Sequence, residues 1–173
     1  MIHTRARLSV WTTLAVLFWL GASISGYAQQ DITAMELRLI GVDGAEIKVT
    51  ADDWSKLPRA TVKAVDHQGA QVTFEGVPVR EVLQLAGAPA GKQLRGKNLS
   101  LYLVAEGADG YRVLYALAEL DADFTDGVIL IADRKDGQAL SPKEGPLRII
   151  VPWEKREARW LRQLVTLTLG RAP

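Results

Sequence analysis

The chain has 173 residues, with 21 Lys and Arg, 20 Asp and Glu, two His and no Cys. The lack of cysteine excludes disulfides, cysteine nucleophiles, iron–sulfur clusters and cysteine-ligated metals within this sequence. The near balance of charge argues against nucleic acid or an anionic membrane as the main partner.

Residues 1–28 have the pattern of a secretory signal peptide. Arg5 and Arg7 give a positive start, residues 8–20 form an apolar run, and small residues ending at Ala28 precede a cleavage point. A retained transmembrane anchor is the alternative, but the apolar run is shorter than the roughly 18 residues expected of a span. We therefore expect export and cleavage, which makes the mature protein periplasmic or secreted and free of the membrane.

Residues 29–173 are expected to form one domain. Loss of Arg5 and Arg7 leaves 19 basic residues against 20 acidic ones, so the mature chain is close to neutral. About 145 residues can bury a core without disulfides. His67 is the one histidine in this range, so a histidine-based metal site or a Ser-His-Asp arrangement would depend on it alone.

The first predicted elements are a β-hairpin and a short helix. Residues 36–40 and 46–49 alternate apolar and polar side chains on either side of a turn. Thr50 and Asp53 have capping-box spacing, which predicts a helix that Pro58 stops.

A second hairpin and a second helix follow. Residues 61–65 and 71–74 flank a turn that contains His67, and Pro78 stands at the start of a segment with apolar residues at helical spacing. Gly87 lies just past the expected end of that helix, which we expect to lie on the sheet.

The rest of the chain reads as strands. Residues 99–105 and 111–115 are expected to form strands around a turn at Asp109 and Gly110. Residues 128–132 and 147–151 are almost wholly apolar and are expected to be adjacent central strands, because they need cover on both faces. A turn at Asp136 and Gly137 is expected between them, and a final strand covers residues 164–169. Eight or nine short strands with two or three inserted helices predict an α+β fold around a mixed β-sheet.

Two features are candidates for a binding site. Asp109, Gly110 and Tyr111 are read most simply as a glycine turn followed by a core tyrosine. Arg148 is more informative, because an arginine inside an apolar strand needs an anionic or carbonyl partner. That partner is either a ligand phosphate or a neighbouring acidic side chain.

The order of these segments resembles the oxidoreductase molybdopterin-binding domain, which has the sulfite-oxidase fold. The resemblance runs from about Leu37 to Leu169, and each motif is weak alone. The segments that carry it are Leu57-Pro58, Phe74-Glu75-Gly76-Val77-Pro78, Asp109-Gly110-Tyr111, Ile129-Leu130-Ile131-Ala132, Gly145-Pro146-Leu147-Arg148-Ile149-Ile150-Val151-Pro152 and Trp160-Leu161.

The resemblance implies a molybdenum cofactor (molybdopterin) held through its pterin and phosphate, with a cysteine thiolate on the metal. In the family that cysteine lies on the segment that here is residues 61–69, which contains none. Asp66 and His67 are the residues there that could substitute, although a turn is the more ordinary role for both. The cofactor-binding candidates are Asp66, His67, Asp109, Tyr111 and Arg148, and we predict no metal site.

Three functional hypotheses follow. The leading one is a small periplasmic family member that has lost molybdenum redox catalysis and binds a small anionic ligand or a periplasmic protein partner. The second is a molybdenum-cofactor-dependent oxidoreductase with a metal ligand other than cysteine. The third is a structural interaction domain whose cleft is vestigial.

Overall fold

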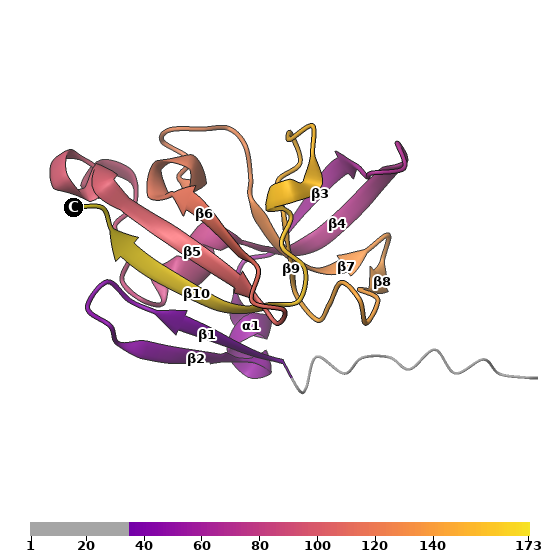
Figure 1. The fold of residues 1–173 in the computed structure, drawn as a ribbon, viewed down its shortest axis with the longest axis horizontal. Coiled ribbons are helices and arrows are strands. Elements are labelled where there is room, and N and C mark those ends of the chain that lie inside the picture. The colour runs from indigo at the N-terminus through magenta and orange to yellow at the C-terminus, as the bar shows by residue number, and fades with distance from the viewer. Residues whose placement is uncertain (1–34) are drawn as a thin grey trace, which may run out of the picture.

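The computed structural model describes residues 35–173, which form two five-stranded β-sheets connected by loops and short helices (Figure 1). The predicted signal peptide lies outside these residues. The first sheet has the strand order β2-β1-β10-β5-β6, and the second has the order β3-β4-β7-β8, with β9 also paired to β7. The strands are β1 (Glu36–Ile40), β2 (Glu46–Thr50), β3 (Ala60–Val65), β4 (Gln71–Pro78), β5 (Leu101–Gly107), β6 (Arg112–Ala116), β7 (Leu130–Lys135), β8 (Gln138–Ala139), β9 (Arg148–Ile150) and β10 (Leu164–Arg171).

The helices are all short. The α-helices are α1 (Ala51–Lys56) and α2 (Val79–Gln84), and the 3-10 helices are η2 (Gly91–Gln93), η3 (Gly96–Ser100), η4 (Leu117–Leu120) and η5 (Glu157–Arg159). The predicted capping box is confirmed, because Thr50 Oγ1 accepts from Asp53 N at 3.3 Å and Asp53 Oδ2 accepts from Thr50 N at 3.0 Å. Pro78 is the N-cap of α2, where a missing N–H costs nothing.

The predicted single mixed sheet is two sheets in the structure. The first sheet is mixed because β1 runs parallel to β10 while its other pairs are antiparallel, and all pairs in the second sheet are antiparallel. One hydrophobic core joins them, with Leu39 and Leu103 from the first sheet and Phe74 and Ile131 from the second. The α+β class predicted from the sequence is therefore confirmed.

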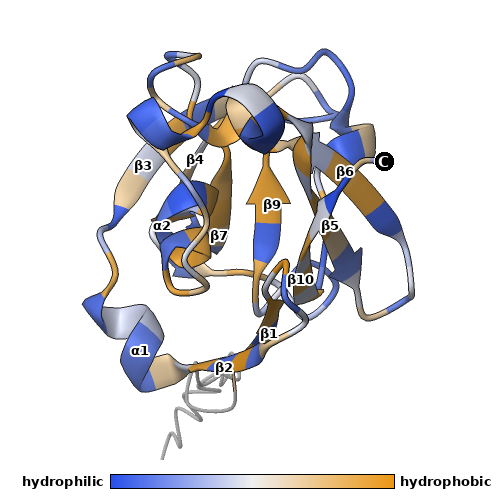
Figure 2. Cartoon of the chain, turned by 90° about the vertical axis from the view of Figure 1, so that its left-hand side faces the viewer, coloured by the Kyte–Doolittle hydropathy of each residue, from blue (hydrophilic) through white to orange (hydrophobic). Residues whose placement is uncertain are grey.

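The predicted adjacency of residues 128–132 and 147–151 is confirmed in a shorter form, but β9 is not a central strand, because β7 is its one strand neighbour in the described sheets. Strand β7 lies between β4 and β9, and Ile131 pairs with Ile149. All three residues of β9 are buried, and the other edge of this strand is covered because Ile149 N donates to Leu161 O at 2.8 Å. Figure 2 shows β9 as a hydrophobic strand with a hydrophilic band at its start, where Arg148 lies. The turn at Asp136 and Gly137 instead joins β7 to the short strand β8.

Strand β4 contains one glycine, Gly76, among larger residues, and the packing against β7 explains it. The β4–β7 pairing shifts register beside it, and a Cβ on Gly76 would lie 2.0 Å from Ile131 O. A larger residue would push the two strands apart, so this close approach needs glycine.

Candidate functional site

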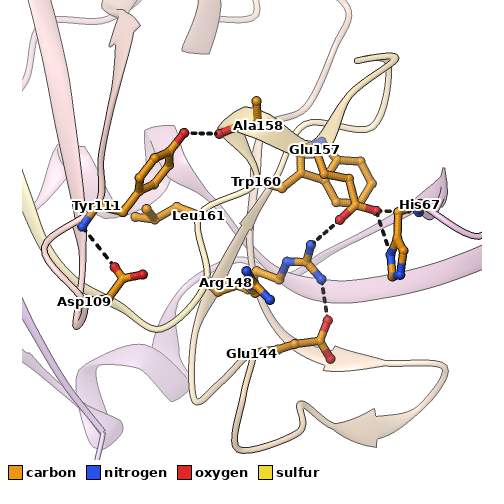
Figure 3. A pocket seen from close by; sticks show the side chains of 10 residues that line it. His67, Asp109, Tyr111, Glu144, Arg148, Glu157, Ala158, Trp160 and Leu161 are labelled. Carbon is orange, nitrogen blue, oxygen red and sulfur yellow. Dashed lines mark hydrogen bonds and ion pairs between the residues drawn. The ribbon is translucent and has the colours of Figure 1, made fainter.

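A pocket of about 470 Å³ opens where the two sheets approach each other beside η5 (Figure 3). Its wall combines residues from the β3–β4 turn, the β5–β6 turn, the start of β9 and the segments before and after β9. The lining residues are His67, Asp109, Tyr111, Glu144, Arg148, Glu157, Ala158, Trp160, Leu161 and Arg162.

Arg148 is the most buried charge in this wall. It is the first residue of β9 and pairs with Ala132 of β7, which places its side chain in the core with 7% of its surface exposed. Its Nη1 donates to Glu144 Oε1, and its Nη2 donates to Glu157 Oε2 at 2.7 Å. Both terminal nitrogens of the guanidinium are therefore used by carboxylates of the chain itself.

Two aromatic rings complete the surroundings of Arg148. Its guanidinium carbon lies 5.5 Å from the ring centre of Trp160 and 6.0 Å from that of Phe74, within the range of cation–π attraction. Its Nε is buried and is without a hydrogen-bond partner among the described residues. The arginine is thus held by two ion pairs and two ring faces.

Glu157 connects Arg148 to the β3–β4 turn. One carboxylate oxygen accepts from Arg148, and the other accepts from the His67 backbone N–H at 2.8 Å. The ring Nδ1 of His67 lies 3.8 Å from that same oxygen, while 72% of the His67 side chain is exposed. His67 therefore lies at the mouth of the pocket, with its ring directed largely to solvent.

The opposite wall comes from the β5–β6 turn. Gly110 has a φ of +80°, a conformation that favours glycine, and Asp109 Oδ1 accepts from Tyr111 N at 3.0 Å across this turn. Tyr111 is half exposed, and its hydroxyl donates to Ala158 O at 2.9 Å. The tyrosine therefore ties the β5–β6 turn to η5, instead of packing into the core as its ordinary reading suggests.

Four of the five candidate residues line this one pocket, namely His67, Asp109, Tyr111 and Arg148. Asp66 does not. Its Oδ1 accepts from Ala70 N at 3.0 Å and from Gln68 N at 2.9 Å, and its Oδ2 lies 3.7 Å from Lys135 Nζ. The hydrogen bonds from Ala70 and Gln68 lower the pKa of the Asp66 carboxyl below its ordinary value. The Asp66 carboxylate therefore stabilises the turn in which it lies.

Sequence reasoning missed the acidic partners of Arg148. Glu144 lies four residues before Arg148 across a turn, and Glu157 lies in a charged segment that also contains Glu154. The need of Arg148 for an anion predicted that a partner exists, but no local pattern distinguishes these two glutamates from their neighbours.

A family model described as the oxidoreductase molybdopterin binding domain matches residues 26–170. The chain belongs to this family. Among solved structures it is similar to the crystal structure of the sulfane dehydrogenase SoxCD from Paracoccus pantotrophus, with a TM-score of 0.59 and 21% sequence identity. The match covers 80% of this chain and 39% of that chain, so this protein spans well under half of the SoxCD chain, and the likeness shows the fold alone. No curated protein matches the chain.

The residues of the pocket do not fit the molybdenum cofactor that the family name implies. The sequence contains no cysteine to supply a thiolate to the metal. Both terminal nitrogens of Arg148 already bind carboxylates, and Asp109, Glu144 and Glu157 add negative charge where a cofactor phosphate would need cations. Within residues 35–173, no group of three or more His, Cys, Asp and Glu side chains could hold a metal ion.

Proposed function

We propose that this protein is an exported, non-catalytic member of the molybdopterin-binding-domain family that works as a ligand- or partner-binding module. The observation that carries the proposal is the internal pairing of Arg148 with Glu144 and Glu157 in a pocket without a thiolate. The wall offers no thiolate to a soft metal, and its one buried cation is neutralised by the chain itself.

The two residues that could replace the thiolate are poorly placed to do so. The Asp66 carboxylate is occupied by the backbone of its own turn, and the His67 ring is held only by its proximity to Glu157. Oxygen and imidazole donors also differ from thiolate in softness, which sets the metals that a site prefers and their electronic state. A molybdenum enzyme with a ligand other than cysteine therefore has no observation in its favour here.

The charge of the pocket supports the same proposal. Three carboxylates line it, against Arg148 and Arg162. The pocket wall offers no net positive charge to a polyanionic cofactor, because Glu144 and Glu157 already neutralise the charge of Arg148. A small ligand for this pocket would have to offer hydrogen-bond donors as well as acceptors.

Export is part of the proposal, and it rests on the charged, apolar and small-residue order of residues 1–28. No helix within residues 35–173 is both long and apolar enough to cross a membrane. N-terminal sequencing of protein recovered from the periplasm tests this part, with a chain that begins at Gln29 as the expected result. Recovery of a chain that still begins at Met1 would contradict it.

The loss of cofactor binding is tested by producing the protein in two matched bacterial hosts, one able and one unable to make the molybdenum cofactor. A ligand that binds only the folded state stabilises it by about 2.7 kcal/mol at 100 times its Kd, so a bound cofactor would raise the melting temperature by several degrees. We expect the same melting temperature and yield from both hosts. A cysteine-bearing member of the family serves as the positive control. A higher melting temperature from the cofactor-producing host alone would reject the proposal.

A further inference from the structure

Residues 152–162 form a segment, here called the strap, that connects β9 of the second sheet to β10 of the first. Figure 1 shows it as the yellow loop that contains η5 and rises between β6 and β3. It supplies one wall of the pocket with its inner side, and its outer side faces solvent.

The strap is tied down at several points. The Tyr111 and Tyr115 hydroxyls donate to the backbone carbonyls of Ala158 and Arg159, and Trp160 Nε1 donates to Val151 O at 2.9 Å. These contacts join it to β6 on one side and to β9 on the other. The strap is therefore held in one conformation before anything binds it.

Both acidic side chains of the strap accept hydrogen bonds from other groups of the protein. Glu157 binds Arg148 and the backbone of His67, and Glu154 Oε1 accepts from Arg159 Nε at 2.6 Å. Arg159 also reaches Glu119 at 3.2 Å. Because both carboxylates of the strap are paired, they add little negative charge to its outer side.

The strap also carries cations without a carboxylate partner. Lys155, Arg156 and Arg162 are exposed, and none of them forms an ion pair with another residue of the described part of the chain. Arg162 lines the pocket, whereas Lys155 and Arg156 do not. Trp153 is 47% exposed and packs against Gly127, where a Cβ would lie 2.5 Å from the indole. The outer side thus carries two unpaired cations, Lys155 and Arg156, and one aromatic ring that packs against Gly127.

We propose that the outer side of the strap is the docking surface for an acidic segment of a protein partner. Trp and Arg are the side chains that most often dominate binding energy at protein interfaces, and complementary charge speeds association and selects partners. A surface that is already ordered loses little entropy on binding. The inference rests on the proposed function, because it takes the chain to be a partner-binding module, and it names the surface and the chemistry of the partner.

An anionic membrane surface is the competing occupant, and the geometry favours it less. Two cations give only weak attraction to a membrane, and stable attachment needs a second contribution such as inserted apolar area. Trp153 packs against Gly127 and is the one large exposed apolar side chain of the strap. A single half-covered indole offers little apolar area to a membrane, so the strap suits an acidic protein segment better.

The test measures binding of a fluorescein-labelled peptide rich in Glu with two Leu residues, by anisotropy at low and at physiological salt. We expect saturable binding that weakens as salt rises. The variant Lys155→Glu/Arg156→Glu should weaken it at least tenfold, and Trp153→Ala should weaken it severalfold. The control variant Lys92→Glu/Lys97→Glu reverses two exposed cations outside the strap and should bind like the wild type. Thermal melts verify that every variant is folded.

Three results would overturn the inference. They are no saturable binding of the peptide, equal binding by the wild type and Lys155→Glu/Arg156→Glu, and binding to vesicles with anionic lipid that exceeds peptide binding and is lost in that variant. Because these measurements use neither molybdenum nor the pocket, their failure would leave the matched-host result of the proposed function intact. A host-dependent melting temperature would leave the peptide result intact in turn.

Discussion

Replacement of Arg148 by Met removes the guanidinium while keeping an apolar stem of similar length. The Glu144 and Glu157 side chains are 22% and 23% exposed, so each would lose its cation while remaining largely out of water. Removing one partner of a buried ion pair typically costs about 3–5 kcal/mol, and the residual hydration of these carboxylates reduces the expected cost to roughly 2–4 kcal/mol. For a domain of this size, such a loss lowers the melting temperature by roughly 10 °C.

Urea denaturation and thermal melts measure this cost. Arg162→Met is the matched control, because Arg162 lies at the same pocket but is exposed and outside the ion pairs, and its replacement should cost less than about 0.5 kcal/mol. The double variant Arg148→Met/Glu157→Gln should be less destabilised than the sum of its single variants, because the two residues share one interaction. A cost below about 1 kcal/mol for Arg148→Met would refute the view that this arginine is neutralised internally.

Three further predictions concern the frame around the site. Because its pKa is lowered in the folded state, the Asp66 carboxyl should titrate below its ordinary value of 3.8 by NMR, and its stabilising contribution, present above that value, should be lost as pH falls through the lower folded pKa. Gly76→Ala should cost at least about 3 kcal/mol or prevent folding, because the new methyl meets Ile131 O, and soluble yield with near-UV circular dichroism reports either result. Arg59→Ala should cost about 2 kcal/mol in urea denaturation, because the buried Asp133 carboxylate loses two hydrogen bonds, at 2.8 and 2.6 Å.

Local patterns predicted local structure well. Thr50 and Asp53 met the spacing of a capping box, and both reciprocal hydrogen bonds are present. The two apolar runs that needed cover on both faces became β7 and β9, paired as expected. Each of these inferences depends on neighbours in the chain or on burial alone, which a sequence carries directly.

Pairing between strands that are far apart in the sequence could not be predicted from local patterns. The first sheet depends on the parallel pairing of β1 with β10, for example Arg38 beside Thr166, and nothing local to either strand specifies the other. The division into two sheets therefore did not follow from strand patterns. The same limit applies to the side chains of the site. The burial of Arg148 predicted an anionic partner, but no local pattern identified Glu144 and Glu157 as that partner.

The sequence supported two different expectations for the role of Asp66. Its place on the segment where the family carries cysteine suggested a substitute ligand, and its place in an Asp-His-Gln-Gly turn suggested a backbone role. In the structure its Oδ1 accepts from two backbone N–H groups of that turn, and the residue does not line the pocket.

The central claim is that the pocket of this family member no longer holds a molybdenum cofactor. Elemental mass spectrometry of protein purified from its native cells, expressed as molybdenum per chain, tests that claim most directly. The account predicts molybdenum at the background level of a buffer blank, together with no pterin fluorescence after acid extraction and oxidation. A ratio that approaches one molybdenum atom per chain would contradict it.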